Sequence, residues 1–185
     1  MTRTLWFLIE TLGSLLVSAC VLRAVAWRVQ LSPRNPINQF LIAATDWLVK
    51  PLRRLLPGSR RTDWASIAAA VLVSVALAVL WTIIFARGRP PAFGGVVMLA
   101  LFWALKWSLY LLIAMVILQA VLSWVNPQAP IAPALDQLTR PFLAPFRRFV
   151  PLVGGVDLSP LVLIVLVQVL LIGLESLFVS LVTMP

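Results

Sequence analysis

The order of hydrophobic and polar positions divides the chain into four long apolar stretches separated by polar segments. Crossing a bilayer as a helix takes about 20 residues at 1.5 Å each, and every one of these stretches is that long. By residue number they run 5–27, 64–86, 96–125 and 158–183. The remaining segments are too short for a folded soluble domain, which usually needs more than about 50 residues. The pattern therefore predicts an all-α membrane protein with four transmembrane helices.

The ends of the predicted spans carry signals of their own. Trp6 and Trp27 bracket the first span, as the aromatic residues of membrane interfaces do. Ser159 followed by Pro160 opens the last span, and this pair suits an N-cap residue followed by the first helical residue. These signals support the boundaries that hydropathy indicates.

Composition strengthens the membrane assignment and removes several kinds of chemistry. Hydrophobic residues make up 62% of the 185 residues and charged residues 11%, against about 25% charged in soluble domains. The chain has no histidine and one cysteine, Cys20, so it has no imidazole base, no His metal ligand and no intrachain disulfide. No nucleotide-binding glycine motif is present. We therefore expect no enzymatic activity, no metal and no cofactor.

The net charge of +9 is distributed unevenly over the loops. Segment 28–63 holds seven Lys and Arg and segment 126–157 holds three, whereas the opposite side holds only Arg3, Arg87 and Arg89. Positive loops stay in the cytoplasm. We therefore predict that both long loops are cytoplasmic and that both termini and segment 87–95 lie outside.

The two halves of the chain repeat each other. A shift of 94 positions gives 16 identities in the 48 positions from Pro33 to Leu80. Shared hydrophobic residues explain some of them, but not the shared Pro, Arg and Asp residues. The chain is thus predicted to be a tandem duplication, with repeat 1 at 1–86, a linker at 87–95 and repeat 2 at 96–185. Because each repeat has two spans, the repeats are expected to be parallel in the membrane.

The shared frame has the form P-x-R-R-x-x-P, followed six residues later by Asp. It spans 51–57 with Asp63 and recurs at 145–151 with Asp157. This frame resembles the signature of the YggT family of small integral membrane proteins. The second copy is the fuller match, with Gly154 and Gly155 before its Asp, whereas the first copy has Ser-Arg-Arg at 59–61.

The resemblance implies a bacterial or plastid membrane protein. The family has loose links to osmotic stress, ion uptake, cell division and the maturation of membrane complexes. No reaction is established for it, so the resemblance supplies no catalytic residues.

Each motif follows a segment whose apolar residues fall at helical spacing, with Asp46, Lys50 and Arg53 on the opposite side in the first copy. We expect each segment to form an amphipathic helix in the cytoplasmic interface, broken into short pieces by its prolines. The cations would either fix topology by snorkelling or bind anionic lipid or a partner protein. The candidate binding residues are Lys50, Arg53, Arg54, Arg60, Arg61, Arg140, Arg147 and Arg148.

The other repeated residues have structural interpretations. Asp63 and Asp157 each precede a span, where a carboxylate stabilises a helix N-terminus. Either could also form a salt bridge with the arginines of its motif. The motif prolines, expected to shape the loops, are Pro51, Pro57, Pro145 and Pro151.

Polar residues inside spans are costly and therefore informative. Five of them are Glu10, Arg23, Lys106, Gln119 and Glu175. We predict that Lys106 pairs with Glu10 or Glu175, as a structural ion pair or as part of a cation path. Ser66, Ala70, Ser74 and Ala78 form a small-residue stripe that permits close helix approach, within the protein or between copies.

These features favour an integral scaffold or assembly protein of the bacterial cytoplasmic membrane. Its partners would be anionic lipids and an unknown membrane protein or a second copy. A small oligomeric ion-transport component is the alternative. Nucleic acid is not expected as a partner, because no stacking surface accompanies the basic residues.

Overall fold

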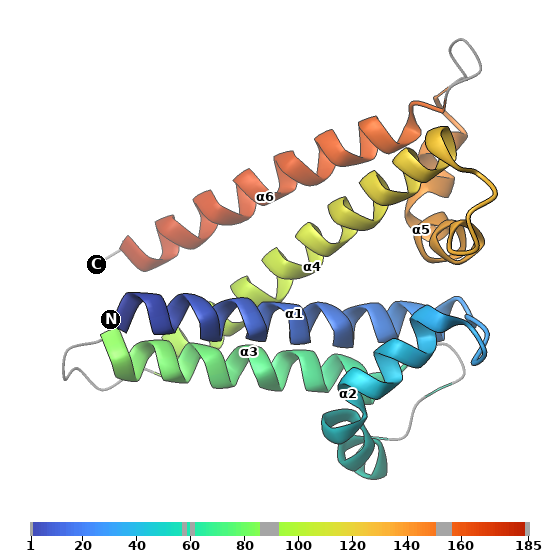
Figure 1. The fold of residues 1–185 in the computed structure, drawn as a ribbon. Coiled ribbons are helices and arrows are strands. Elements are labelled where there is room, and N and C mark those ends of the chain that lie inside the picture. The colour runs from blue at the N-terminus through green and yellow to red at the C-terminus, as the bar shows by residue number, and fades with distance from the viewer. Residues whose placement is uncertain (1, 57–58, 60–61, 86–92, 151–156, 184–185) are drawn as a thin grey trace. The chain divides into compact units, whose positions relative to one another are not determined.

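The computed structural model describes residues 2–56, 59, 62–85, 93–150 and 157–183, and within these ranges every regular element is a helix. Figure 1 shows the helices in chain order. They are α1 (Thr2–Arg28), α2 (Pro36–Leu55), α3 (Trp64–Phe85), α4 (Phe93–Val125), α5 (Ala132–Arg147) and α6 (Ser159–Thr183).

Four of the helices, α1, α3, α4 and α6, are long and apolar enough to cross a membrane. The all-α fold class is therefore confirmed for the described residues, and each of the four spans predicted from hydropathy corresponds to one of these long apolar helices. Two helices extend past the predicted spans, since α1 begins at Thr2 and α4 at Phe93. Hydropathy marks the apolar stretch, whereas backbone hydrogen bonding continues through the polar or small residues beside it.

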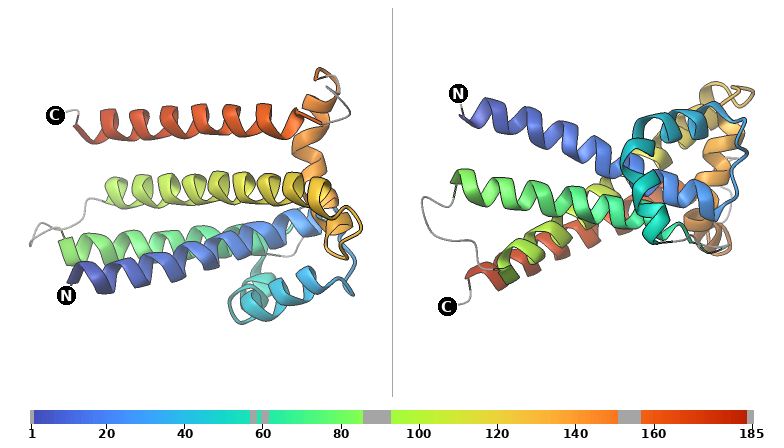
Figure 2. Two further views of the ribbon diagram at one scale, coloured as in Figure 1. Left: turned by 45° about the horizontal axis from the view of Figure 1, so that its top comes forward. Right: turned by 90° about the horizontal axis from the view of Figure 1, so that it is seen from below.

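The chain forms two compact units, residues 1–108 and 109–185. In the first unit α1 and α3 lie side by side, and α2 connects the C-terminal end of α1 to α3 (Figure 1 and Figure 2). The boundary between the units falls inside α4. The first part of that helix belongs to unit 1 because Trp103 and Trp107 contribute to its aromatic and hydrophobic core.

The small-residue stripe of α3 is buried within this unit. Ser66, Ala70, Ser74 and Ala78 are at most 3% exposed. Ala70 joins a core cluster with Val17 and Cys20 of α1, and Ala78 packs against the first turns of α4. A Cβ atom on Gly13 of α1 would overlap the side chain of Leu77. The stripe therefore serves close packing within the chain, which was one of the two predicted uses.

In the second unit, the remaining part of α4 packs with α5 and α6 around one hydrophobic cluster. Val116 of α4, Leu143 of α5 and Val167 of α6 lie in this cluster and are at most 2% exposed. In each unit one short helix thus lies between two long helices in chain order, and unit 1 also holds the first part of α4. This composition matches the helix–basic segment–helix order of the predicted repeat.

The short helices α2 and α5 run through their prolines. Asn35 caps α2 by accepting a hydrogen bond from the N–H of Ile37 at 3.0 Å. The helix then continues through Pro51, and α5 continues through Pro141 and Pro145. The expectation that prolines divide these segments into short pieces is wrong. All three prolines are exposed, so a helix can bend away from the ring and the freed carbonyl can bond to water. The ribbon of α2 does change direction along its length (Figure 1).

Candidate functional site

The first basic motif is fastened to the start of α3 by a buried aspartate. The Arg53 guanidinium donates to Oδ2 of Asp63 at 2.6 Å. The Asp63 carboxylate also accepts the backbone N–H of Ser66 at 3.4 Å and its hydroxyl at 2.7 Å. Asp63 is therefore both the N-cap of α3 and the acceptor of an ion pair. The two roles suggested by the sequence coexist in one side chain.

The second motif repeats this arrangement at the start of α6 in a more exposed form. Nε of Arg147 donates to Oδ2 of Asp157 at 3.0 Å, and Oδ1 of Asp157 accepts the N–H of Ser159 at 2.9 Å. The Asp157 side chain is 31% exposed, whereas that of Asp63 is fully buried. The position equivalent to Ser66 is Pro160, which has no N–H, so Asp157 caps one residue earlier.

The start of α6 differs by one residue from the prediction. The sequence suggested Ser159 as the N-cap residue. In the structure the carbonyl of Leu158 accepts the first helical hydrogen bonds, from Leu161 and Val162. Ser159 is therefore the first helical residue and Pro160 the second. Proline is tolerated at both positions because neither N–H would have a partner within the helix.

A second set of polar contacts joins α1 to α2 in the first unit and α4 to α5 in the second. Near the end of α1, the buried Arg23 donates to the hydroxyl of Thr45 at 2.7 Å and to Asp46 at 2.8 Å. Asp46 also bridges to Lys50, at 3.5 Å. Arg23 is only 6% exposed, and a buried cation is tolerated when it is paired and hydrogen-bonded. This polar residue of the first span is therefore an anchor for α2.

In the second unit a neutral side chain takes the same place. Gln119 of α4 receives a hydrogen bond from the hydroxyl of Thr139 at 2.6 Å and donates to Asp136 at 3.0 Å. Asp136 also faces Arg147, at 3.4 Å. Arg147 thus lies between two carboxylates, whereas Arg53 bonds one. The equivalent threonines, Thr45 and Thr139, are fully buried.

Two aspartates of these clusters have perturbed acidities. Burial alone would raise the pKa of Asp46, but its hydrogen bond with Arg23 and the charges of Arg23 and Lys50 outweigh this and hold the pKa below its ordinary value. Burial likewise acts against the hydrogen bonds of Asp157 with Ser159 and Arg147, and the net pKa of Asp157 is also lowered. Both carboxylates are therefore ionised at neutral pH, as their ion pairs require.

Trp27 completes the first centre and was missed as a site residue. The Arg53 guanidinium lies over its ring, 5.0 Å from the centroid, and its indole N–H donates to the carbonyl of Ser59 at 3.1 Å. The sequence marked Trp27 only as an interface residue. The threonines were missed as well, although the identity of Thr45 and Thr139 within the repeat was a signal that could have revealed them.

A pocket lies beside each centre. The first has a volume of about 420 Å³ and the second about 280 Å³. Aligning the repeats requires a shift of 96 positions up to Trp27 and of 94 from Pro33 onward. Seven of the eight residues lining the second pocket then match residues lining the first. The pockets are therefore equivalent, and differences in their lining are changes of chemistry on the same scaffold.

The other predicted binding residues lie around these centres. Lys50, Arg54, Arg140 and Arg148 are all exposed. Pro51 and Pro145 lie on exposed helix surfaces. Four motif residues, Pro57, Arg60, Arg61 and Pro151, fall outside the described part of the chain.

The charged span residues predicted to lie toward the outer side are not part of either centre. Lys106 lies over the ring of Phe102, 5.5 Å from its centroid, and Glu10 is half-buried on α1. Glu175 is exposed on α6, in the other unit. The pairing of Lys106 with Glu10 or Glu175 stays a prediction.

The arrangement can bind anions and fix helices, and its residues suggest no metal centre. Within the described ranges no group of three or more His, Cys, Asp or Glu side chains is placed to hold a metal ion. The polar side chains of both centres are instead arginine, aspartate, threonine, glutamine and serine.

Comparison with known proteins agrees with the repeat. The family described as CCB3/YggT matches the chain in two segments, residues 2–84 and 98–178. An uncharacterized protein of Pseudomonas aeruginosa is 35% identical over 161 residues, covering 84% of this chain and 80% of its own. The protein described as "Uncharacterized protein YggT" of Escherichia coli K12 is 33% identical over 175 residues, covering 94% and 90%. A protein of Vibrio alginolyticus is 34% identical, with 88% of each chain covered.

No solved structure matches the chain. The sequence matches alone cover both halves, and the relatives exceed 30% identity over most of their length. The chain, with its two copies of the arginine–aspartate frame, belongs to the CCB3/YggT family.

Proposed function

We propose that the protein is a multi-pass scaffold of the bacterial cytoplasmic membrane that docks anionic lipid or a partner membrane protein through its two basic motifs. It carries out no reaction of its own. The observation that carries this proposal is that the two arginines of each Arg-Arg pair have different contacts. Arg53 and Arg147 bond to the aspartate that starts the next span, while Arg54 and Arg148 form no ion pair within the described residues. One arginine holds the motif in place and its neighbour is left to bind.

The surroundings of the second arginines suit a membrane interface. On α2, Phe40 and Trp47 are exposed, and so is Lys50. Next to Arg148, Phe149 is 85% exposed. Aromatic residues beside cations favour the headgroup region, where each cation contributes about 1 kcal/mol at an anionic surface. In this proposal α2 and α5 lie as amphipathic helices at the cytoplasmic face, and the repeats are parallel.

Co-purification in mild detergent tests this function. The double variant Arg54→Ala with Arg148→Ala should lose the partners that the wild-type protein retains, because it removes the docking cations and spares the ion pairs of Arg53 and Arg147. The matched control is Arg28→Ala with Arg34→Ala, which removes the same charge from two exposed residues outside the motifs. The control should retain the partners.

Ion transport is the competing function, and flux measurements distinguish it from the scaffold. If the protein is a scaffold, the Arg54→Ala/Arg148→Ala variant should leave ion flux through reconstituted vesicles unchanged. Flux that requires Glu10, Lys106 or Glu175, with co-purification unaffected by loss of Arg54 and Arg148, would refute the scaffold function.

A further inference from the structure

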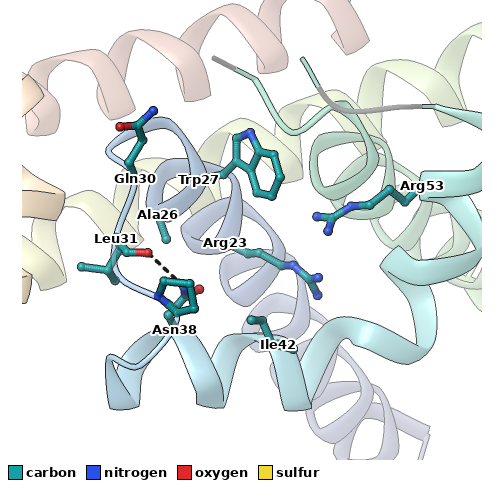
Figure 3. Close-up of a pocket in the computed structure, with 9 residues that line it drawn as sticks. Arg23, Ala26, Trp27, Gln30, Leu31, Asn38, Ile42 and Arg53 are labelled. Atoms are coloured by element: carbon teal, nitrogen blue, oxygen red, sulfur yellow. Dashed lines mark hydrogen bonds between the residues drawn. The ribbon is translucent and has the colours of Figure 1, made fainter. Parts of the chain in front are cut away.

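The pocket beside the first centre presents two cations to one cavity. Arg23 comes from α1 and Arg53 from α2, and both line the cavity together with Trp27 and Asn38 (Figure 3). None of the described residues that line it is acidic. At about 420 Å³ it falls within the size range of small-molecule sites, which is about 300–1,000 Å³.

Both guanidinium groups are held by carboxylates that do not line the cavity. Asp46 and Thr45 fix Arg23, and Asp63 with the ring of Trp27 fixes Arg53. An arginine has five N–H donors, and these contacts use only part of them. The Nε atom of Arg53 is buried and finds no acceptor among the described residues. The pocket is therefore lined by two arginines that other groups hold in place and that keep N–H donors beyond those contacts, which favours a ligand with oxygen acceptors.

The equivalent pocket of the second repeat lacks this excess charge. Gln119 replaces Arg23 and Asp136 replaces Ile42, so the described lining holds one cation and one carboxylate. Asp136 also contacts Arg147 directly. On the same scaffold, one repeat thus presents two cations to its pocket while the other neutralises its single arginine internally.

The first pocket is also partly apolar. Leu31, Ala26 and Ile42 line it beside the two arginines, and it lies at the C-terminal end of a membrane-spanning helix. A ligand that fits has an anionic group next to hydrocarbon. A phospholipid headgroup at the interface meets both requirements, and arginine is well suited to phosphate because its planar donors bond two oxygens at once.

We infer that this pocket binds the phosphate of one anionic phospholipid, with Arg23 and Arg53 as the phosphate ligands. The inference rests on the proposed docking of anionic lipid and assigns it a defined site in repeat 1 only. The basic surface around Arg54 attracts lipid generally, whereas the pocket holds one molecule.

Native mass spectrometry of the full chain in mild detergent tests the site, with phosphatidylglycerol as the probe and phosphatidylcholine as the zwitterionic comparison. The wild-type protein should retain one phosphatidylglycerol in preference to phosphatidylcholine. Ile42→Asp places the carboxylate of the second repeat in the first pocket and leaves both arginines intact. This variant should bind the lipid at least about tenfold more weakly, because like charges at a binding surface are strongly unfavourable.

The matched control is Ala43→Asp, which adds the same charge to the exposed side of the same helix, outside the pocket lining. Ala43→Asp should bind within about twofold of wild type, since an exposed charge is well screened. Equal loss in both variants, or no loss in either, would overturn the site. Gln30→Glu gives a second probe, because Gln30 is exposed and lines the same pocket, so the change does not disturb the core. It should also weaken binding.

A competition experiment with inorganic phosphate distinguishes a bound lipid from a bound free phosphate. Inorganic phosphate at millimolar concentration should not displace the lipid, and displacement would overturn the lipid assignment in favour of a soluble phosphate. The Arg54→Ala/Arg148→Ala variant should keep its one bound lipid. If it keeps its protein partners as well, the docking function fails while the pocket stands.

Discussion

The two centres occupy equivalent positions but differ in how deeply their charges are buried. In the first, Asp63 is fully buried and Arg23 nearly so. In the second, Arg147, Asp136 and Asp157 are each 31–48% exposed. The same Arg-to-Asp contact should therefore contribute differently to the stability of the two halves. A duplicated frame can keep its geometry while one copy becomes a rigid anchor and the other a solvated network.

Removing the ion-paired arginine of each motif, Arg53 or Arg147, should show this difference in burial most strongly. Arg53→Ala leaves Asp63 as an unpaired buried carboxylate, and we expect a loss of about 3–5 kcal/mol. Arg147→Ala leaves its carboxylates partly exposed to water, and we expect at most about 1 kcal/mol. Thermal unfolding of both variants in the same detergent checks the difference. Equal losses would contradict the assignment of different weights to the two ion pairs.

Replacing Arg23 with glutamine, the residue at the equivalent position 119, should have an intermediate effect on stability. Arg23→Gln keeps a side chain able to bond Thr45, as Gln119 bonds Thr139, but removes the charge that faces Asp46. We expect a loss of about 2 kcal/mol, typical of a charged hydrogen bond. Restoring most of the loss with Asp46→Asn in the same chain would confirm that the charge pair is responsible. No recovery would show that the packing of Arg23, rather than its charge, sets the cost.

Helix packing provides a comparison outside the charged centres. Gly13→Ala forces the new methyl group against Leu77, and we expect a loss of about 1–3 kcal/mol. Gly173 of α6 is exposed, and no described atom lies within 4 Å of the position that a methyl group would take there. Gly173→Ala should therefore be neutral or stabilising by up to about 1 kcal/mol. Melting temperatures of the two variants test this. A destabilised Gly173→Ala would show that α6 is closely packed at that point.

Acid titration should give the smallest effect. Asp46 and Asp157 have folded-state pKa values below their ordinary values. Each therefore contributes stability that is fully present above the unfolded pKa of about 3.9 and is lost as the pH falls through the lower folded pKa. We expect less than about 1 kcal/mol from each partly exposed pair. Unfolding measured from about pH 6 to about pH 2 should show the decline, and Asp46→Asn should reduce it. A stability that rises on acidification would contradict the lowered pKa values.

The sequence was sufficient for features that depend on local pattern. Long apolar runs gave the four spans, and the repeated spacing of Arg53 with Asp63 and of Arg147 with Asp157 pointed to their ion pairs. The ten-residue separation in each copy survived duplication because each pair joins the end of a short helix to the start of the next span.

Features that depend on contacts across elements could not be derived in this way. The side chain that meets Arg23 depends on the angle at which α2 returns to α1, and hydropathy does not encode that angle. Ile42 looked like one apolar residue among many, and only the folded pocket shows that it stands where Asp136 neutralises the second repeat. The effect of the prolines was misjudged because an exposed proline bends a helix that a buried one would break.

Labelling of substituted cysteines reports directly on whether both basic motifs face the cytoplasm, as we propose for parallel repeats. In a Cys20→Ala background, which removes the single native cysteine, Arg54→Cys and Arg148→Cys should react with a membrane-impermeant maleimide only after the cells are permeabilised. Arg3→Cys, in the N-terminal segment predicted to lie outside, should react in intact cells. Labelling of positions 54 and 148 from opposite sides would rule out parallel repeats, and labelling of both in intact cells would rule out a cytoplasmic location of the motifs.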